Sequence, residues 1–199
     1  MGQIMRYWQY PEMCTGSHSY TPDGYLEQIV DFGATAYDWG NMPNYLNSST
    51  TTEAQLHAVA TLLWHCGVAV DMSYGVNGSG ASSYDALYAL TEYFNYSDEL
   101  FWSEKTDNES WLAQIKSNLD LNMPIMYRGT NDISGGGHAF VCDGYDSNDY
   151  LHFNWGWSGN HNGYFALDAL NPTQYNNYNG SNAAIFNIHP DYTVYYQIS

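Results

Sequence analysis

The stretch "GGGHAFVCDGYDSNDYLHFNWGW" (residues 135–157) carries the strongest structural signal in the chain. Three glycines lead into His138, and the apolar run that follows predicts a strand. The segment "GYDSNDY" is rich in turn residues, so the next run, with Asn154 and Trp155, predicts a second strand paired antiparallel to the first. Counting back from a turn near Ser147 brings His138 and Asn154 toward the same end of this hairpin, if one strand overhangs or bulges.

This arrangement makes His138 a candidate acid/base group. An amide oxygen on Asn154 would accept a hydrogen bond from one imidazole nitrogen, fix the tautomer and leave the other nitrogen for proton transfer. The indole of Trp155 would shield that hydrogen bond from water. Gly135–Gly137 would let the backbone take positive φ and let a substrate approach closely. The alternative is a structural histidine at a strand end, which is the commoner case for a lone histidine.

An imidazole oriented by an amide is typical of a site with a cysteine nucleophile. None of the three cysteines of this chain fits that role well. Cys142 is four strand positions from His138, roughly 13 Å away. Cys66 falls near the end of a predicted helix, where the dipole raises a thiol pKa. Cys14 follows a turn after Pro11. The three cysteines show no CxxC spacing, which argues against a disulfide framework or a thiolate zinc site.

Upstream of the hairpin the sequence predicts mainly helices. "MGQIMRYWQYP" predicts a helix that ends at Pro11 and has no Ser, Thr, Asp or Asn to cap its first turn. A turn at Pro22–Gly24 predicts a small hairpin. A long helix is expected with a Ser or Thr cap near positions 49–51 and Glu53 in its first turn. Its expected apolar face consists of Leu56, Val59, Ala60 and Leu63.

Two further helices are expected, one capped by Ser82 or Ser83 and one capped by Asp107. After Pro124, five strand-like runs are separated by Gly, Asn and Asp. Helices that precede strands predict an α+β fold. The expected division is a helical lobe over about residues 1–122, a β-rich lobe over about 123–190 and a C-terminal tail over 191–199.

Composition narrows the function classes. Four Lys+Arg against 21 Asp+Glu give a net charge of −17, which excludes nucleic acid as a partner. The sequence contains no run of 18 apolar residues, so it predicts no membrane span. It does not start with a basic segment followed by an apolar run, so no signal peptide is expected in it. Twenty tyrosines and seven tryptophans, with few charges, favour a secreted or cell-surface protein over an acidic cytosolic enzyme.

No metal or other cofactor is predicted, because the remaining histidines form no pair at metal-ligand spacing. These are His18, His57, His65, His152, His161 and His189.

The blocks "GGHAFVCDGYD" and "YLHFNWGWSGNHNGYFALDALNP" resemble the second half of streptopain-type cysteine peptidases, a papain-like family of secreted bacterial proteases. "GQIMRYWQYP", "GVAVDMSYGVNGSGAS" and "NMPIMYRG" resemble family segments in the same order. The resemblance covers roughly residues 1–190 and implies a papain-like peptidase domain over that range.

The resemblance implies roles for particular residues. His138 matches the catalytic histidine, Asn154 the residue that orients it, and Trp155 a tryptophan needed near the active site. The loop with Gly78, Ser79, Gly80 and Ser82 resembles part of the substrate-binding wall. Gly136 and Gly137 resemble the flexible segment before the histidine.

The chain departs from the family pattern at its start. The family nucleophile lies in a run like Cys-Val-Ala-Thr-Ala-Met-Ala-Gln-Ile-Met, and Met1–Met5 match only the end of it. The cysteine is therefore expected a few residues before Met1, and the oxyanion-hole glutamine further upstream. The resulting expectation is a secreted cysteine endopeptidase that lacks its signal, its propeptide and its nucleophile, and that is inactive as given.

Protein or peptide substrates, and a propeptide in the full-length precursor, are the partners that the resemblance implies. Two alternatives remain: a non-catalytic relative that binds peptide or glycan, and a cell-wall amidase or other hydrolase on the same papain-like frame.

Overall fold

The computed structural model describes residues 1–193 and divides into two compact units. Unit 1 contains Met1–Asp98 together with the chain from Pro190, and unit 2 contains Glu99–His189. The boundary therefore falls before the last helix rather than near residue 122, because that helix packs on strands of unit 2. Asp191 joins unit 1 through hydrogen bonds with Tyr10 and Asn95. Residues 194–199 of the predicted tail lie outside the described residues.

Unit 1 is mainly helical and contains one small hairpin. Its elements are α1 (Gly2–Trp8), β1 (Ser17–Tyr20), β2 (Gln28–Asp31), the 3-10 helix η1 (Trp39–Asn41), α2 (Glu53–Val68) and α3 (Ser83–Glu92). The predicted N-terminal helix, hairpin and two later helices are confirmed. β1 pairs antiparallel with β2, so the turn at Pro22–Gly24 connects the strands as expected.

Helix α2 begins one residue later than predicted and buries a different face. Thr52 is the N-cap, and its side chain and that of Gln55 form a reciprocal capping box. The predicted apolar face is wrong, because Leu56 and Leu63 are 54% and 57% exposed. The buried residues are Ala58, Leu62, His65, Gly67 and Val68. The helix carries apolar side chains on more than one side, so periodicity alone did not select the buried one.

The buried face of α2 includes a histidine. His65 is 4% exposed, and its Nδ1 lies 3.0 Å from the hydroxyl oxygen of Tyr37. The rings of Phe32 and Trp64 lie against it. Burial lowers the pKa of His65 below its ordinary value of 6.5, because the charged imidazolium is desolvated.

We expect His65 to make the protein less stable in mild acid. Between the lowered pKa and 6.5 the unfolded chain binds more protons at this site than the folded chain does. The contribution of neutral His65 to the free energy of unfolding is fully present above pH 6.5. It is lost as the pH falls through the lowered pKa of the folded state. One such histidine contributes a slope of at most about 1.4 kcal/mol per pH unit.

Urea unfolding measured from pH 7.5 to pH 5 would check this expectation. His65→Gln should flatten the slope of unfolding free energy against pH, whereas the control His57→Gln, on the exposed side of α2, should leave it unchanged. Equal slopes for the wild type and His65→Gln would contradict the expectation.

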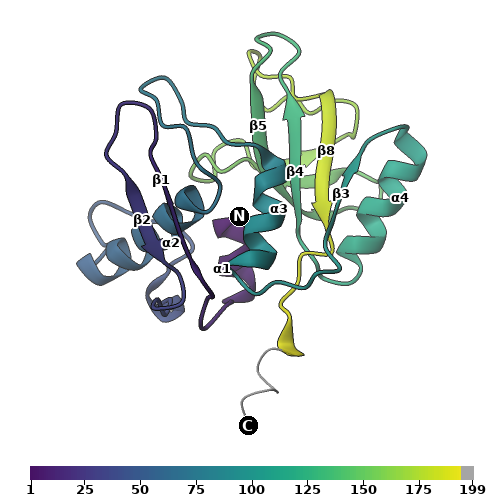
Figure 1. Cartoon of the computed structure of the whole chain (residues 1–199). Helices are drawn as coiled ribbons and strands as arrows, with labels where there is room; N and C mark the ends of the chain where they lie inside the picture. Colours follow the sequence, from purple (N-terminus) through teal and green to yellow (C-terminus); the bar gives the residue numbers. More distant parts are fainter. Residues whose placement is uncertain (194–199) are drawn as a thin grey trace. The chain divides into compact units, whose positions relative to one another are not determined.

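Unit 2 is an antiparallel sheet with one helix packed on it (Figure 1). Its elements are β3 (Phe101–Glu104), α4 (Asn108–Leu119), β4 (Ile125–Thr130), β5 (Gly137–Tyr145), β6 (Leu151–Asn154), β7 (Gly163–Phe165) and β8 (Gly180–Phe186). The strand order is β3-β8-β4-β5-β6-β7. The five predicted strands and the α+β class are confirmed. Strand β3, which is only four residues long, was not predicted.

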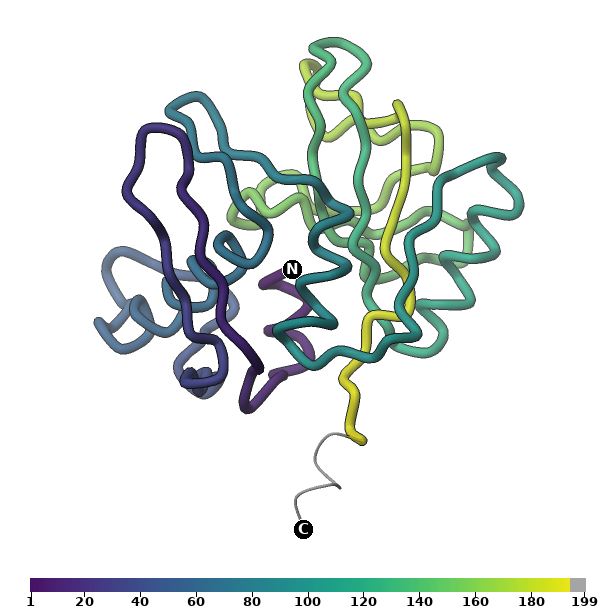
Figure 2. The backbone as a smooth tube through the Cα atoms, in the orientation of Figure 1, coloured from purple at the N-terminus to yellow at the C-terminus, as the bar shows by residue number. Residues whose placement is uncertain are grey.

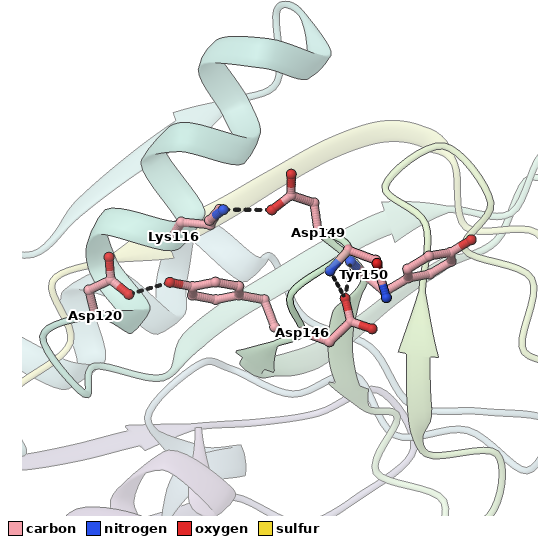
Figure 3. Close-up of polar contacts among 7 residues, drawn as sticks. Lys116, Asp120, Asp146, Asp149 and Tyr150 are labelled. Atoms are coloured by element: carbon pink, nitrogen blue, oxygen red, sulfur yellow. Dashed lines mark hydrogen bonds and ion pairs between the residues drawn. The ribbon is translucent and has the colours of Figure 1, made fainter.

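The turn between β5 and β6 is held by polar contacts with α4 (Figure 3). Lys116 of α4, one of four basic residues in the chain, lies 2.5 Å from a carboxylate oxygen of Asp149. The hydroxyl of Tyr145 donates to Asp120, and the backbone amide of Tyr150 donates to Asp146. Exposed ion pairs stabilise by only about 0–1 kcal/mol, so these contacts chiefly fix the turn and the register of the hairpin.

The core of unit 2 is aromatic and lies between α4 and the sheet. Its buried members include Trp111, Tyr127, Phe140, Phe153, Trp155 and Phe186. Trp111 donates a hydrogen bond from its indole nitrogen to the hydroxyl of Tyr127. Because Phe140 and Trp155 belong to this core, the end of the sheet that carries His138 is built on rigid packing.

Candidate active site

His138 lies near the start of β5, beyond the end of the β6 ladder. Gly129 of β4 is its partner on one side. On the other side the ladder with β6 begins at Val141↔Asn154, with a bulge between Cys142 and Gly144. The hairpin thus has an overhang and also a bulge, either of which was the condition set from the sequence.

The backbone of Trp155 orients His138. The Nε2 atom of His138 lies 2.8 Å from the carbonyl oxygen of Trp155. A carbonyl oxygen only accepts hydrogen bonds, so in the neutral imidazole Nε2 carries the proton and Nδ1 keeps its lone pair. The structure therefore leaves Nδ1 as the atom available for proton transfer.

The ladder places Asn154, the residue predicted to orient His138, on the opposite face of the sheet from His138. Successive strand residues point to opposite faces, so His138 and Val141, three positions apart, lie on opposite faces of the sheet. Asn154 is directly opposite Val141 and shares its face. Its side-chain oxygen accepts the backbone N–H of Gly156. The Trp155 carbonyl is thus the group in contact with Nε2 of His138, and the orienting role of Asn154 stays a prediction.

Aromatic rings surround the imidazole. The rings of Trp157 and Phe140 stack on it with centroid distances of 5.1 and 5.7 Å, and the ring of Tyr178 lies at 5.2 Å. Burial lowers the pKa of His138 below 6.5, and the hydrogen bond to the Trp155 carbonyl partly offsets this effect. The neutral, basic form of His138 is therefore favoured at neutral pH.

Trp155 contributes its ring and its backbone rather than its indole N–H. The side chain is fully buried, and its ring centroid lies 4.4 Å from that of Phe140. Among residues 1–193 its Nε1 has no hydrogen-bond partner. A ring buried in this way excludes water, as the predicted shielding by the indole requires.

The glycine segment before His138 closes a tight connection between β4 and β5. Gly135 has φ of +76°, a conformation that favours glycine. The backbone amide of Asn131 donates to the Gly136 carbonyl, and Gly137 pairs with Thr130. Gly136 and Gly137 are exposed, and a Cβ at Gly137 would meet nothing within 4 Å.

The other predicted substrate-binding residues lie in unit 1, in the loop before α3. Gly78, Ser79 and Gly80 are exposed, and Gly80 forms a bridge with Ser73. Ser82 is the N-cap of α3 and accepts a hydrogen bond from the amide of Tyr84. Its hydroxyl therefore caps the helix, and its role in substrate binding stays a prediction.

The cysteines are protonated core or near-core residues. Cys14 and Cys142 are buried, at 4% and 0% exposure, and Cys66 is half-buried. Burial raises the pKa of Cys14 to about 12 and that of Cys66 to about 11, and raises the pKa of Cys142 as well. A nucleophilic thiol needs the opposite shift. No described group of three His, Cys, Asp or Glu side chains is placed to hold a metal ion.

Three residues that were not predicted also contribute to this end of the sheet: Trp157, Tyr178 and Asn131. Trp157 was visible in "NWGWSG" beside the predicted site residues. Tyr178 and Asn131 gave no signal, because both come from connections whose course in space depends on contacts distant in sequence.

The fold and this histidine define a protein of the papain-like cysteine protease class. Active interpain A, a cysteine protease of Prevotella intermedia, superposes with a TM-score of 0.86 at 36% identity, over 92% of this chain and 78% of that one. A fragment of prointerpain A from the same organism superposes with a TM-score of 0.81 at 35% identity, over 96% of this chain and 61% of that one.

The model of the Peptidase C10 family matches residues 1–165, and the chain belongs to this family. Streptopain of Streptococcus pyogenes is 34% identical over 94% of this chain. The thiol protease/hemagglutinin PrtT of Porphyromonas gingivalis is 36% identical over 86% of this chain and 20% of its own length. The chain spans about half the length of streptopain. The resemblance, the papain-like fold and the family are thereby confirmed.

Proposed function

We propose that the protein is a cysteine peptidase that hydrolyses peptide bonds, with His138 as its acid/base group. The observation that carries the proposal is the contact of His138 Nε2 with the Trp155 carbonyl, which leaves Nδ1 free to exchange a proton. The names of the relatives support the same chemistry: interpain A is a cysteine protease and PrtT a thiol protease.

The proposed reaction has two steps. A thiolate attacks the carbonyl carbon of the scissile peptide bond, and the imidazolium of His138 gives its proton to the leaving amine as the C–N bond breaks. Water then attacks the resulting thioester while His138 takes one of its protons. The acid is released, and the proton returns the pair to its thiolate–imidazolium state.

The thiolate in this proposal is not Cys14, Cys66 or Cys142. Their burial and raised pKa values keep all three protonated near neutral pH. Catalysis therefore requires a thiol from outside residues 1–199, and the 199-residue chain alone is inactive. The exposed backbone at Gly78–Gly80, and separately at Gly136 and Gly137, is proposed to contact peptide substrate.

We further propose that the protein acts outside the cell, secreted or on the surface, and is made as a precursor with a propeptide. The scarcity of charged residues and the many tyrosines support an extracellular site. The existence of a proform of interpain A supports the propeptide. Among residues 1–193 no helix combines the length and apolarity that crossing a membrane requires.

A fluorogenic peptide assay tests the proposal. The 199-residue chain should give only background hydrolysis, unchanged when its three cysteines are replaced by alanine. The same chain, produced with the sequence that its gene encodes in frame before Met1, should hydrolyse peptide if that sequence contains a Cys-Val-Ala-Thr-like run. Thiol-dependent turnover by the 199-residue chain that disappears in the alanine variant would contradict the proposal.

A second candidate function, non-catalytic binding of peptide or glycan, is favoured by a groove in unit 1. The groove has a volume of about 430 Å³ and is lined by Pro22, Tyr25, Gln28, Leu63, Trp64 and Tyr74. The indole nitrogen of Trp64 donates to the amide oxygen of Gln28. Ligand binding that is lost in Trp64→Ala but kept in His138→Gln, in a protein without hydrolytic activity, would support this function instead.

A further inference from the structure

The ring of Tyr178 forms one wall of the His138 environment. Tyr178 belongs to the connection between β7 and β8, and we call residues 171–179 the strap. Its side chain is 7% exposed, and its centroid lies 5.2 Å from that of His138. Because Trp157 also contacts the imidazole, at 5.1 Å, two rings from different connections limit its rotation.

The backbone of Tyr178 is fixed on both sides. Its amide donates to the carbonyl of Leu170, and its carbonyl accepts a hydrogen bond of 2.7 Å from the side chain of Asn182, which is 5% exposed. The carbonyl also lies against Gly129, where any Cβ would collide with it. Gly129 is the cross-strand partner of His138, so the sheet leaves space for the strap at the level of the histidine.

A buried amide ties the strap to the glycine segment. Asn131 is 4% exposed, and its Nδ2 lies 3.2 Å from the Tyr175 carbonyl oxygen and 3.1 Å from the side-chain oxygen of Asn176. The backbone of Asn131 exchanges hydrogen bonds of 2.7 Å with Gly135 and Gly136. Figure 2 shows the two connections side by side at the end of unit 2.

We propose that Tyr178, held by this strap, is a positioning residue that keeps the imidazole of His138 turned toward the Trp155 carbonyl. The inference rests on the proposed function, since it assigns Tyr178 a task in that reaction. A flat ring at this distance stops the imidazole from turning over, a motion that would exchange Nδ1 and Nε2. The strap therefore determines which nitrogen is available as the base.

The groups that face His138 within unit 2 are the rings of Phe140, Trp157 and Tyr178 and the carbonyl of Trp155. Of these only the Tyr178 phenol titrates, and burial raises its pKa, so it is neutral wherever His138 titrates. Tyr178 therefore acts on His138 by filling space and excluding water. Its charge does not change over the pH range in which His138 titrates.

The test compares Tyr178→Ala with Tyr178→Phe, which keeps the ring, and with Tyr175→Ala, a matched control whose side chain on the same strap is 72% exposed. Two readouts need no turnover: the tautomer and pKa of His138 by ¹⁵N NMR, and the rate of its modification by diethylpyrocarbonate, measured site by site.

In Tyr178→Ala the pKa of His138 should rise toward 6.5, the Nε2–H tautomer should lose its dominance, and modification should become several-fold faster. Tyr178→Phe and Tyr175→Ala should match the wild type.

An unchanged tautomer and modification rate in folded Tyr178→Ala would overturn the inference. If that variant does not fold, Tyr178→Leu fills the same space without a flat ring and should shift the same readouts. In a form that hydrolyses peptide, Tyr178→Ala should lower kcat by about 10- to 100-fold with less change in KM. Normal hydrolysis by His138→Gln would contradict the proposed function. The tautomer of His138 measured by NMR tests the positioning by Tyr178 separately, because it needs no hydrolysis.

Discussion

Iodoacetamide should modify Cys14, Cys66 and Cys142 of the folded chain at least about 10-fold more slowly than it modifies free cysteine at pH 7.5. A pKa of about 12 for Cys14, against an ordinary 9.0, lowers the thiolate fraction about 10³-fold, and a pKa of about 11 for Cys66 lowers it about 10²-fold. The higher nucleophilicity of a more basic thiolate recovers only about half of this on a logarithmic scale. Burial of the sulfur atoms slows the reaction further.

The measurement is mass spectrometry of each cysteine peptide after timed alkylation. The control is the same chain in denaturant, where all three thiols should react at one common rate. A cysteine that reacts in the folded chain as fast as free cysteine, or faster, would be a candidate nucleophile. That result would contradict the proposal that the thiolate comes from outside residues 1–199.

Replacing His138 should have the largest effect on catalysis. In a form of the protein that hydrolyses peptide, His138→Gln should lower kcat/KM by about 10³-fold or more. In the proposed reaction this one side chain both maintains the thiolate and protonates the leaving amine, and general acid–base catalysis alone is worth about 10²- to 10⁴-fold. Glutamine can still donate a hydrogen bond to the Trp155 carbonyl but cannot exchange a proton at neutral pH.

His152→Gln is the matched control. His152 lies on β6, one strand away, and its Nδ1 contacts Asp143 rather than the groups around His138. This variant should keep kcat/KM near the wild-type value. Asn154→Ala should have a much smaller effect than His138→Gln, because the Asn154 side chain belongs to the opposite face. An equally large loss in Asn154→Ala would restore the orienting role that the sequence suggested for that residue.

Local sequence patterns predicted the elements of this fold well. The glycine-rich approach to His138, the turn at residues 146–150 and the apolar run after it identified a hairpin with an overhang, because strand and turn preferences act over a few residues. Asp107 was predicted as an N-cap, and Ser82 as one of two candidates with Ser83, because such side chains satisfy amides only two or three residues away.

Features that depend on distant contacts could not be predicted in the same way. Helix α2 carries apolar side chains on more than one side, and the side that is buried is the one on which His65 contacts Tyr37. The orienting group of His138 is a backbone carbonyl, which no residue type reveals. Its neighbour Tyr178 comes from a polar connection in which the hydrogen bonds of Asn131 and Asn182 fix the path.

The most direct test of the central claim is the tautomer of His138 in the 199-residue chain. Long-range ¹H–¹⁵N NMR of histidine-labelled protein, assigned with His138→Gln, distinguishes a protonated ring nitrogen from one with a free lone pair. The structure predicts that neutral His138 has a protonated Nε2 and a free Nδ1, and that it titrates below pH 6.5. A dominant Nδ1–H tautomer, or titration at or above pH 6.5, would contradict His138 as a base held by the Trp155 carbonyl.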